Sequence, residues 1–385
     1  MTKPYADLRV VDFSTTIAGP HCTRMLADMG AEVIKIEAPD GDMMRSRPPQ
    51  RGGASSAFGQ LNAGKKSVVL DLKSARAVDA ARRLAATADV VVENYRPGVM
   101  QRLGLDYSTL SASNSRLIYC AISGYGQSGP SSHLPAYAPV IHAASGYDLA
   151  HLGYQEGRHR PDYCGIFVAD VISGVYAFGA IGTALHQRHM TGQGTFVDVS
   201  MLESMLSLTL TELQAAQFPV TLPRRPIFGP VETADGFVML AVANERTFGN
   251  LAKAAGRPDL VTDPRFQKYS DRRANWGELM EIVEEWSREL TREDCLAQLE
   301  RHGVPSSPYR TVEQALADPQ IAHRGALAEV ADVGGTFKAL NPPFRMSGAD
   351  TSAGRYAPRL GEHTREVLLA VGLSGAEVDA LDSLG

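Results

Sequence analysis

The chain has 385 residues, a formal net charge of -5, 44% hydrophobic residues and 21% charged residues. This length is sufficient for two domains, and the composition is that of a soluble globular protein. The net negative charge argues against nucleic acid or an anionic membrane as the main partner. The four cysteines are far apart and form no CxxC pair, and residues 1–7 contain no apolar run typical of a signal peptide. We therefore expect a cytoplasmic protein without disulfides or a zinc ribbon.

The first 125 residues alternate apolar strands with helices. Residues 8–13 (LRVVDF) form a β-branched run typical of a buried parallel strand. Residues 20–29 predict a helix that has proline in its first turn and Gly30 just after its end. Further strands are expected at 33–36, 67–72, 90–95 and 117–123, with a helix at 74–86. This alternation predicts an α/β fold with a Rossmann-like, doubly wound parallel sheet.

The segment 165–185 (GIFVADVISGVYAFGAIGTAL) is almost entirely apolar, and Asp170 is its only charged residue. Its length would suffice to cross a bilayer. The glycines after Asp170 and the lack of a second such segment favour a buried core helix instead, which we expect over 170–187. A short strand at 197–201 and a helix at 202–217 follow.

Four prolines between 219 and 230 break regular structure and indicate a linker. We therefore expect a large domain over residues 1–218, a linker over 219–235 and a smaller α/β domain over 236–325. The last segment, 326–385, is rich in Gly and Pro until a final helix at 364–371.

Two segments resemble nucleotide-binding motifs, but each lacks a residue or a neighbouring element that its motif requires. Gly124, Gly126 and Gly129 form GxGxxG after a strand, but no helical pattern begins there, so no NAD site is expected. Residues 59–66 (GQLNAGKK) lack the Ser or Thr that a Walker A motif needs to hold magnesium. The local cluster of lysines, Lys65, Lys66 and Lys73, is expected on a solvated face.

The remaining common catalytic patterns are also missing. His21, His133, His142 and His151 have no metal-ligand spacing with nearby acids or cysteines, so no metal is expected. There is no GxSxG nucleophile elbow, which removes the common serine-hydrolase route.

Asp170 admits two interpretations from the residues alone. An aspartate at the start of an apolar helix is often the N-cap, because its carboxylate accepts hydrogen bonds from the first-turn amides. An ionisable group in apolar surroundings is also a candidate catalytic residue. The local pattern leaves both interpretations open.

Several sequence segments, spread along nearly the whole chain, can be compared as an ordered set with a known family. The segments are VVDFSTTIAGPHCTRMLADMGAEVIKIEAPDGD at 10–42, LNAGKKSVVLDLKS at 61–74, VVVENYRPGVMQRLGL at 90–105, ISGYGQSGP at 122–130, VADVISGVYA at 168–177 and TGQGTFVDVSMLE at 191–203. ADGFVMLAVANERTF, DPRF and HGVPSSP follow further on. Taken together and in this order, they resemble the class III coenzyme A transferase family, which includes formyl-CoA transferase, carnitine CoA-transferase and α-methylacyl-CoA racemase.

The resemblance implies that Asp170, in the AD-x-x-x-G segment that ends at Gly174, is the covalent nucleophile. A carboxylate is ionised at neutral pH without a helper base. It is a weak nucleophile, so the site must supply proximity to the acyl-CoA carbonyl. The implied reaction passes through an aspartyl–acyl anhydride and an aspartyl-CoA thioester. Amides at the helix start would stabilise the developing charge.

The resemblance also implies residues that contact coenzyme A, the co-substrate. They lie in the first strand–helix turn and after two later strands, and they are Thr16, Ile17, Ala18, Leu70, Lys73, Asn94, Tyr95 and Arg102. Lys73 and Arg102 suit phosphate by charge. Tyr137 matches a family tyrosine near the nucleophile, although a half-buried loop tyrosine is its alternative interpretation.

The sequence departs from the formyl/oxalate members of the family at three places. It has Ile17 where they have glutamine, Phe228-Gly229-Pro230 where they have a run of glycines in a lid, and Ala38 where they have a basic residue that contacts the nucleotide. These departures argue against formate or oxalate as the substrate, and Ile17 suggests a less polar acyl pocket.

The resemblance further implies a smaller α/β domain, a C-terminal segment that returns to the large domain, and a homodimer of two interlocked subunits. Two other functions are considered. A 2-methylacyl-CoA racemase needs two bases, one on each face of the α-carbon. The His-Asp pair of racemases is absent from residues 134–140 (LPAYAPV). A non-catalytic CoA-binding protein would have no need of Asp170.

Overall fold

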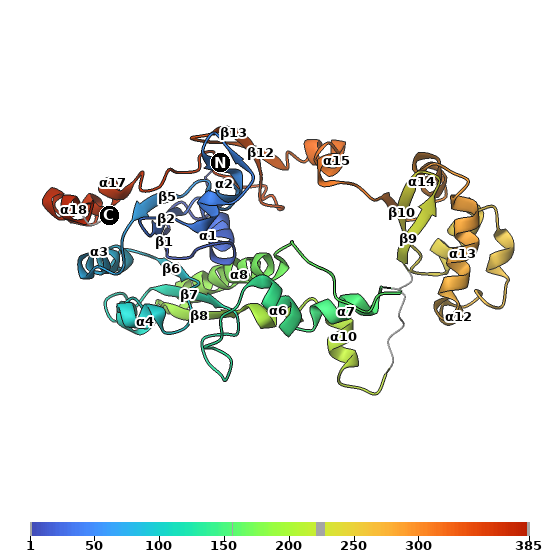
Figure 1. The fold of residues 1–385 in the computed structure, drawn as a ribbon, viewed down its shortest axis with the longest axis horizontal. Helices are drawn as coiled ribbons and strands as arrows, with labels where there is room; N and C mark the ends of the chain where they lie inside the picture. Colours follow the sequence, from blue (N-terminus) through green and yellow to red (C-terminus); the bar gives the residue numbers. More distant parts are fainter. Residues whose placement is uncertain (1, 156, 221–227, 383–385) are drawn as a thin grey trace. The chain divides into compact units, whose positions relative to one another are not determined.

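The computed structural model describes residues 2–155, 157–220 and 228–382. The chain forms two compact units, drawn as ribbons in Figure 1. The first contains Met1–Asp148, Asp162–Leu210 and Gln320–Gly385, and the second contains Leu149–Pro161 and Thr211–Pro319.

The centre of the first unit is a six-stranded parallel sheet. Its strand order is β5-β2-β1-β6-β7-β8, which is the 3-2-1-4-5-6 order of a doubly wound nucleotide-binding fold. The order reverses between β1 and β6, so the carboxyl ends of these two strands flank the usual ligand crevice. The strands are β1 (Arg9–Asp12), β2 (Glu32–Glu37), β5 (Lys66–Val69), β6 (Val90–Glu93), β7 (Ile118–Ser123) and β8 (Thr195–Ser200).

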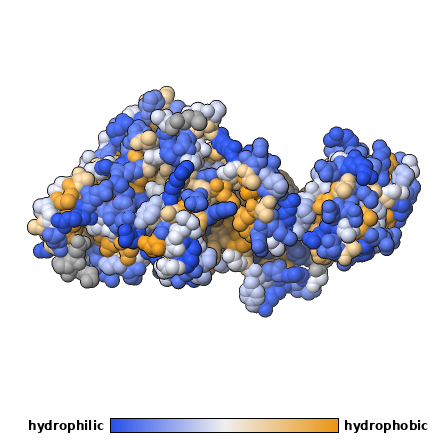
Figure 2. All heavy atoms as spheres, turned by 90° about the horizontal axis from the view of Figure 1, so that it is seen from above, coloured by the Kyte–Doolittle hydropathy of each residue, from blue (hydrophilic) through white to orange (hydrophobic). Residues whose placement is uncertain are grey.

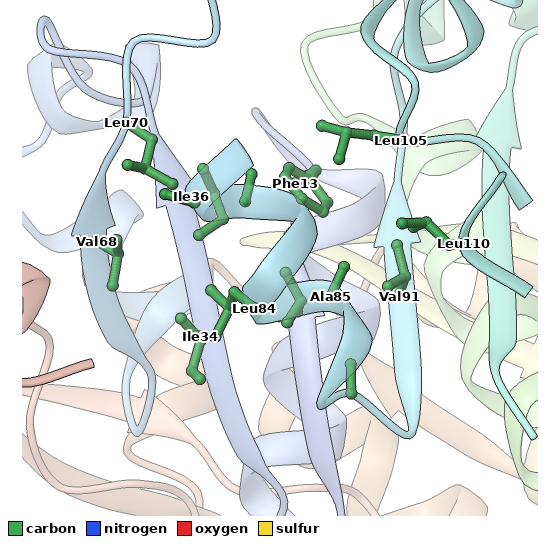
Figure 3. Packing of buried hydrophobic residues seen from close by; sticks show 14 of the residues in the cluster. Phe13, Ile34, Ile36, Val68, Leu70, Leu84, Ala85, Val91, Leu105 and Leu110 are labelled. Atoms are coloured by element: carbon green, nitrogen blue, oxygen red, sulfur yellow. The ribbon is translucent and has the colours of Figure 1, made fainter. Parts of the chain in front are cut away.

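Alternate residues of the strands face two separate hydrophobic cores. One core contains Phe13, Ile34 and Leu70 and packs beneath the helices α3 (Ala75–Ala86), α5 (Tyr107–Ser111), α17 (Thr364–Ala370) and α18 (Gly375–Asp382). Part of this core is shown in Figure 3. The other core packs beneath α1 (Ala18–Asp28), α6 (Ala138–Ala144) and α8 (Val168–Thr191). Helices therefore cover both faces of the sheet.

The same unit contains several shorter elements. These are η1 (Met43–Ser46), β3 (Gln50–Arg51), β4 (Ala54–Ser55), α2 (Ser56–Asn62), α4 (Val99–Leu103), α9 (Met201–Leu206), α16 (Pro319–His323), β12 (Leu327–Asp332) and β13 (Gly335–Leu340). The hairpin of β12 and β13 packs on α2. The chain beyond Gln320 thus belongs to the first unit.

The second unit has a three-stranded antiparallel sheet in the order β11-β10-β9, and its own core. The strands are β9 (Phe228–Thr233), β10 (Gly236–Ala241) and β11 (Ser306–Pro308). The helices are α10 (Leu210–Ala215), α11 (Glu245–Ala254), η2 (Pro258–Val261), α12 (Tyr269–Ala274), α13 (Trp276–Ser287), α14 (Arg292–Arg301) and α15 (Val312–Leu316), and α7 (Tyr147–Gly153) contributes its last residues.

Several local expectations differ from the structure. The helix predicted over 202–217 is interrupted at 207–209, which separates α9 from α10. The end of the predicted linker is strand β9, which includes Pro230, while residues 221–227 of that linker lie outside the described residues. Residues 149–161 and 211–218, assigned to the large domain from the sequence, cluster with the second unit. Local patterns do not report these groupings, because they depend on contacts between distant parts of the chain.

Helix α8 is less buried than expected for a core helix. Among the described residues it is the one helix long and apolar enough to span a membrane, and a third of its most apolar window is buried. One face packs on α1 and the sheet, while Val171, Val175 and Tyr176 are exposed. Apolar patches on an otherwise hydrophilic surface are visible in Figure 2.

Candidate active site

Asp170 is the third residue of α8. The N-cap position is occupied by Phe167, which provides no side-chain cap. The interpretation of Asp170 as the N-cap is therefore wrong. Its carboxylate instead accepts a hydrogen bond from the backbone N–H of Ala18, the first residue of α1.

The carboxylate of Asp170 thus lies where two helices begin. Helix N-termini stabilise negative charge. Burial opposes this effect and raises the pKa of Asp170 to about 6, although the hydrogen bond from Ala18 lowers it. At neutral pH the group is therefore mostly ionised, and it is more basic than an ordinary aspartate.

Gly174 lies one helical turn after Asp170 on the same face of α8. A Cβ atom at this position would lie 2.7 Å from the carbonyl oxygen of Ala18 and 3.1 Å from the Cδ2 atom of His21. Only a residue without a side chain allows α8 to approach α1 this closely. The AD-x-x-x-G segment therefore joins a carboxylate to the glycine that brings it to the start of α1.

The turn after β1 reaches the crevice where the strand order reverses. Thr16 has a φ angle of +71°, which is unusual for a residue with a side chain. Its backbone N–H points to the carboxylate of Asp42, at 3.3 and 3.2 Å from the two oxygens. Asn94, just after β6, accepts from the N–H of Thr15 and donates to its carbonyl oxygen, each at 2.8 Å. This side chain holds together the two loops that flank the crevice.

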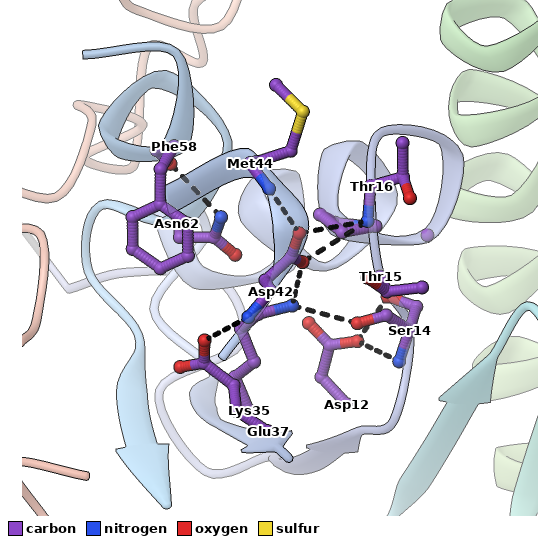
Figure 4. A network of polar contacts seen from close by, with 12 residues as sticks. Asp12, Ser14, Thr15, Thr16, Lys35, Glu37, Asp42, Met44, Phe58 and Asn62 are labelled. Atoms are coloured by element: carbon purple, nitrogen blue, oxygen red, sulfur yellow. Dashed lines mark hydrogen bonds and ion pairs between the residues drawn. The ribbon is translucent and has the colours of Figure 1, made fainter. Parts of the chain in front are cut away.

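A buried network of charged residues supports the turn from below (Figure 4). The Nζ atom of Lys35 lies 2.9 Å from Asp42 and donates to the carbonyl oxygen of Ser14. Asp12 accepts from the N–H of Ser14 and pairs with the Nζ atom of Lys65 at 3.0 Å. Burial raises the pKa of Asp12, but Lys65 and Lys35 outweigh it and hold the pKa below its usual range. The turn is therefore fixed by buried side chains from several elements.

The solvated face expected for the lysine cluster is wrong for Lys65. Its side chain is fully buried and donates to Asp12, Pro20, Thr23 and Asn62. Burial lowers its pKa to about 8, because it disfavours the charged form more than Asp12 favours it. The charged residue inside the β-branched run VIKIE, at Lys35, was the sequence signal for such a network.

The predicted CoA-contacting residues follow the carboxyl ends of three strands, β1, β5 and β6, and Arg102 lies in the helix α4 after β6. Leu70 is a core residue, so its side chain packs beneath the edge. Lys73 and Arg102 are exposed, and neither has a salt bridge among the described residues. Burial raises the pKa of the Tyr95 phenol. Lys73 follows β5 and Arg102 lies in α4, after β6, so the two cations belong to different crossover segments of the same sheet.

The two predicted acyl-contacting residues differ in exposure. Ile17 is buried in a small apolar cluster with Met44, Phe58 and Leu61, which accounts for an apolar side chain there. Tyr137 is 68% exposed at the N-cap of α6 and is not the half-buried loop residue of the alternative interpretation. The stretch Phe228-Gly229-Pro230 is part of strand β9, paired with β10. It is therefore regular sheet rather than a loop.

His142 is a functional candidate that the sequence patterns did not reveal. It lies in α6, and its Nε2 atom accepts from the backbone N–H of Ala169 at 3.1 Å. Ala169 directly precedes Asp170. No local sequence pattern indicates this contact, because it joins two helices through a single side chain.

An open pocket of about 340 Å³ lies beside β6 and β7 and contains none of the predicted site residues. The Tyr119 hydroxyl and the Gln127 amide nitrogen line it and have no hydrogen-bond partner among the described residues. Burial raises the pKa of Glu93, which also lines it, to about 8. These groups are separate from the helix junction at Asp170.

Comparisons with known proteins agree with this geometry. The model of "CoA-transferase family III" matches residues 5–364. The chain belongs to CoA-transferase family III. It is 33% identical over 382 residues to "Succinate--glutarate CoA-transferase" of Agrobacterium fabrum, which covers 95% of each chain. It is 36% identical over 369 residues to "Acetyl-CoA:oxalate CoA-transferase" of Acetobacter aceti, covering 93% of each.

A similar protein of known structure has the same fold. A CAIB/BAIF family protein from Brucella suis superposes with a TM-score of 0.83 at 32% identity, covering 96% of this chain and all of that one. Membership in family III confirms the resemblance found in the sequence and identifies the chain as a CoA-transferase with coenzyme A as co-substrate. The six-stranded parallel sheet confirms the predicted Rossmann-like α/β class. Among the described residues no group of His, Cys, Asp and Glu could hold a metal ion.

Proposed function

We propose that the protein is an acyl-CoA:carboxylate CoA-transferase in which Asp170 carries the acyl group and then coenzyme A. The observation that supports this role is the position of the Asp170 carboxylate at the start of two helices, with the N–H of Ala18 as donor. A carboxylate with a pKa raised to about 6 is ionised at pH 7 and is a better nucleophile than an ordinary one.

The proposed reaction begins with attack of an Asp170 oxygen on the thioester carbonyl of the donor. The C–S bond breaks, CoA leaves as a thiolate, and a mixed anhydride remains. The thiolate attacks the Asp170 carbonyl, which releases the donor acid and forms an aspartyl-CoA thioester. The acceptor carboxylate attacks this thioester and again displaces the thiolate. Attack of the thiolate on the acceptor acyl carbon then gives the new acyl-CoA and restores Asp170.

Proximity contributes to the rate in such a scheme, because both partners are bound in one site. The amides of Ala18, Val168 and Ala169 are already hydrogen-bonded, so the proposed donors to the oxyanion that develops at each attack are other first-turn amides of α1 and α8. The carboxyl edge of β5, β2, β1 and β6 is the proposed binding surface for coenzyme A. Lys73 and Arg102 are its proposed phosphate partners, because both are exposed cations and neither pairs with an acid in the described part of the chain.

The proposed substrates are short dicarboxylic acids and their CoA thioesters. The names of the relatives from Agrobacterium fabrum and from Chloroflexus aurantiacus, "Succinyl-CoA--D-citramalate CoA-transferase", support this class. Oxalate is named for the Acetobacter aceti relative. Ile17 and the strand at Phe228-Gly229-Pro230 argue against oxalate for this chain. A cytoplasmic, interlocked homodimer is proposed as the working form, and light scattering on dilution tests the dimer.

The deciding experiment separates transfer from racemisation and from simple CoA binding. The enzyme is incubated with succinyl-CoA, treated with hydroxylamine and digested. The mass of the peptide that contains Asp170 is then measured by mass spectrometry. Transfer through Asp170 gives an acyl or CoA adduct before trapping and an aspartyl hydroxamate after it. The Asp170→Asn variant is the matched control, and it should give neither.

The alternatives predict different outcomes of the same incubation. A racemase leaves no adduct and exchanges the α-proton of a 2-methylacyl-CoA for solvent deuterium. A non-catalytic CoA-binding protein shows binding alone. Either outcome, in the absence of a trappable adduct with a panel of acyl-CoA thioesters and acids, would overturn the proposed function.

A further inference from the structure

The first turn of α8 depends on a side chain from another helix. The first amides of a helix have no partner within the helix and need acceptors elsewhere. Phe167 at the N-cap position cannot supply one with its side chain. The N–H of Val168 donates to the carbonyl oxygen of Ile166, and the N–H of Ala169 donates to the Nε2 atom of His142. His142 therefore replaces the missing cap.

We infer that His142 is a positioning residue that fixes the first turn of α8 and thereby the Asp170 carboxylate. This inference rests on the proposed role of Asp170. Ala169 and Asp170 are adjacent, so a shift of the Ala169 amide moves the next residue with it. On the other side, Asp170 is bound by the N–H of Ala18. The nucleophile is thus held between α1 and a histidine of α6.

The contact defines the protonation state of His142. An Nε2 atom that accepts a hydrogen bond carries no proton, so the proton of the neutral ring is on Nδ1. A positive charge here would face both the Ala169 N–H and the positive end of the α8 dipole. Burial lowers the pKa of His142, and Asp148 acts in the opposite direction. His142 is 1% exposed, and its Nδ1 atom has no partner among the described residues.

The packing of α6 does not depend on the imidazole alone. Ala138 and Ile141 of this helix are fully buried in the same core as Ala169 and Ala177 of α8. A leucine at position 142 would keep the apolar contact and remove only the acceptor. A glutamine would keep an acceptor, its Oε1 atom, at a similar distance from the backbone.

The test compares His142→Leu with His142→Gln in single-turnover formation of the Asp170 adduct from succinyl-CoA. A misplacement of about 1 Å costs on the order of 100-fold in rate, so we expect His142→Leu to lose about 10- to 100-fold in the single-turnover rate constant, with the half-saturating succinyl-CoA concentration within about 2-fold. His142→Gln should stay within about 3-fold of the parent, because it restores the acceptor. Wild-type rates in His142→Leu, or equal losses in both variants, would overturn the inference.

A measurement on the unmodified protein decides the case even where His142→Leu fails to fold. Histidine-selective ¹⁵N NMR, assigned with the glutamine variant, reports which ring nitrogen carries the proton. We expect an unprotonated Nε2 and a protonated Nδ1 at pH 7. A proton on Nε2 would contradict the inference. If the wild-type enzyme forms no Asp170 adduct at all, the proposed function fails instead.

Discussion

The backbone N–H of Ala18 donates a hydrogen bond to the carboxylate of Asp170, although the two residues lie far apart in the chain and on different helices. This contact places the proposed nucleophile at the first strand–helix turn, beside the crevice where the strand order reverses. A carboxylate on α8 alone would have no defined relation to that crevice. The pairing of α1 with α8 therefore defines the candidate active site.

The pH dependence of the reaction should report the state of Asp170. Its pKa is raised to about 6 by burial, so below pH 6 the protonated form predominates and cannot attack. We expect kcat/KM to fall about 10-fold for each pH unit below this value. Initial rates with acids that are fully ionised above pH 5 measure this, and circular dichroism checks that the fold persists. A flat profile down to pH 5 would contradict the assigned pKa.

Replacement of Asp170 by asparagine should stabilise the fold while it removes activity. The raised pKa means that ionisation of Asp170 is disfavoured in the folded state. A pKa difference of one between the folded and unfolded states corresponds to about 1.4 kcal/mol, and partial exposure reduces the effect. We therefore expect the free energy of unfolding to rise by about 1–3 kcal/mol at pH 7. The gain should shrink toward pH 4, where the carboxyl is protonated in the folded state and about half protonated in the unfolded state. Urea unfolding at the two pH values measures it, and a destabilised Asp170→Asn would refute this explanation.

Gly174→Ala should separate α8 from α1. The new Cβ atom would lie 2.7 Å from the Ala18 carbonyl oxygen, which belongs to the backbone and cannot easily move. Overpacking of this kind costs about 1–3 kcal/mol, and the displaced Asp170 should lower kcat by about 10-fold or more. Thermal unfolding and steady-state kinetics measure the two effects.

Gly179→Ala is the matched control for this substitution. Gly179 lies in the same helix and has no atom within 4 Å of an added Cβ. The change should leave activity intact and stabilise α8 by up to about 1 kcal/mol. Equal losses in the two variants would show that the close approach at Gly174 is not special.

Lys73→Ala and Arg102→Ala should weaken binding of coenzyme A. Both side chains are exposed cations without a salt bridge among the described residues. We expect about 3- to 10-fold loss of affinity for each at low salt, and a smaller loss at high salt, because ions screen the attraction to phosphate. Lys253→Ala, an exposed cation of α11, should leave affinity unchanged. Calorimetry with free coenzyme A measures these constants, and unchanged affinity in both test variants would move the proposed binding surface elsewhere.

Much of the architecture was predictable from the sequence. Runs such as LRVVDF and VVVE are apolar enough to be buried on both faces, so they predict parallel strands between helices. The ordered motifs identified the family, and with it Asp170 as the candidate nucleophile. Element boundaries were less predictable, because the break between α9 and α10 and the pairing of Pro230 in β9 depend on neighbours outside each segment.

The sequence by itself determined the fold class, the family and the residue types that carry the chemistry. The tertiary structure alone decided which of these residues meet. It pairs the buried Lys65 with Asp12, packs Gly174 against Ala18 and forms the hydrogen bond from the Ala169 amide to His142. Each of these contacts joins residues that are distant in the chain or lie on separate elements. Local propensity reports the conformation of a segment, whereas burial and hydrogen bonding depend on which segments pack together.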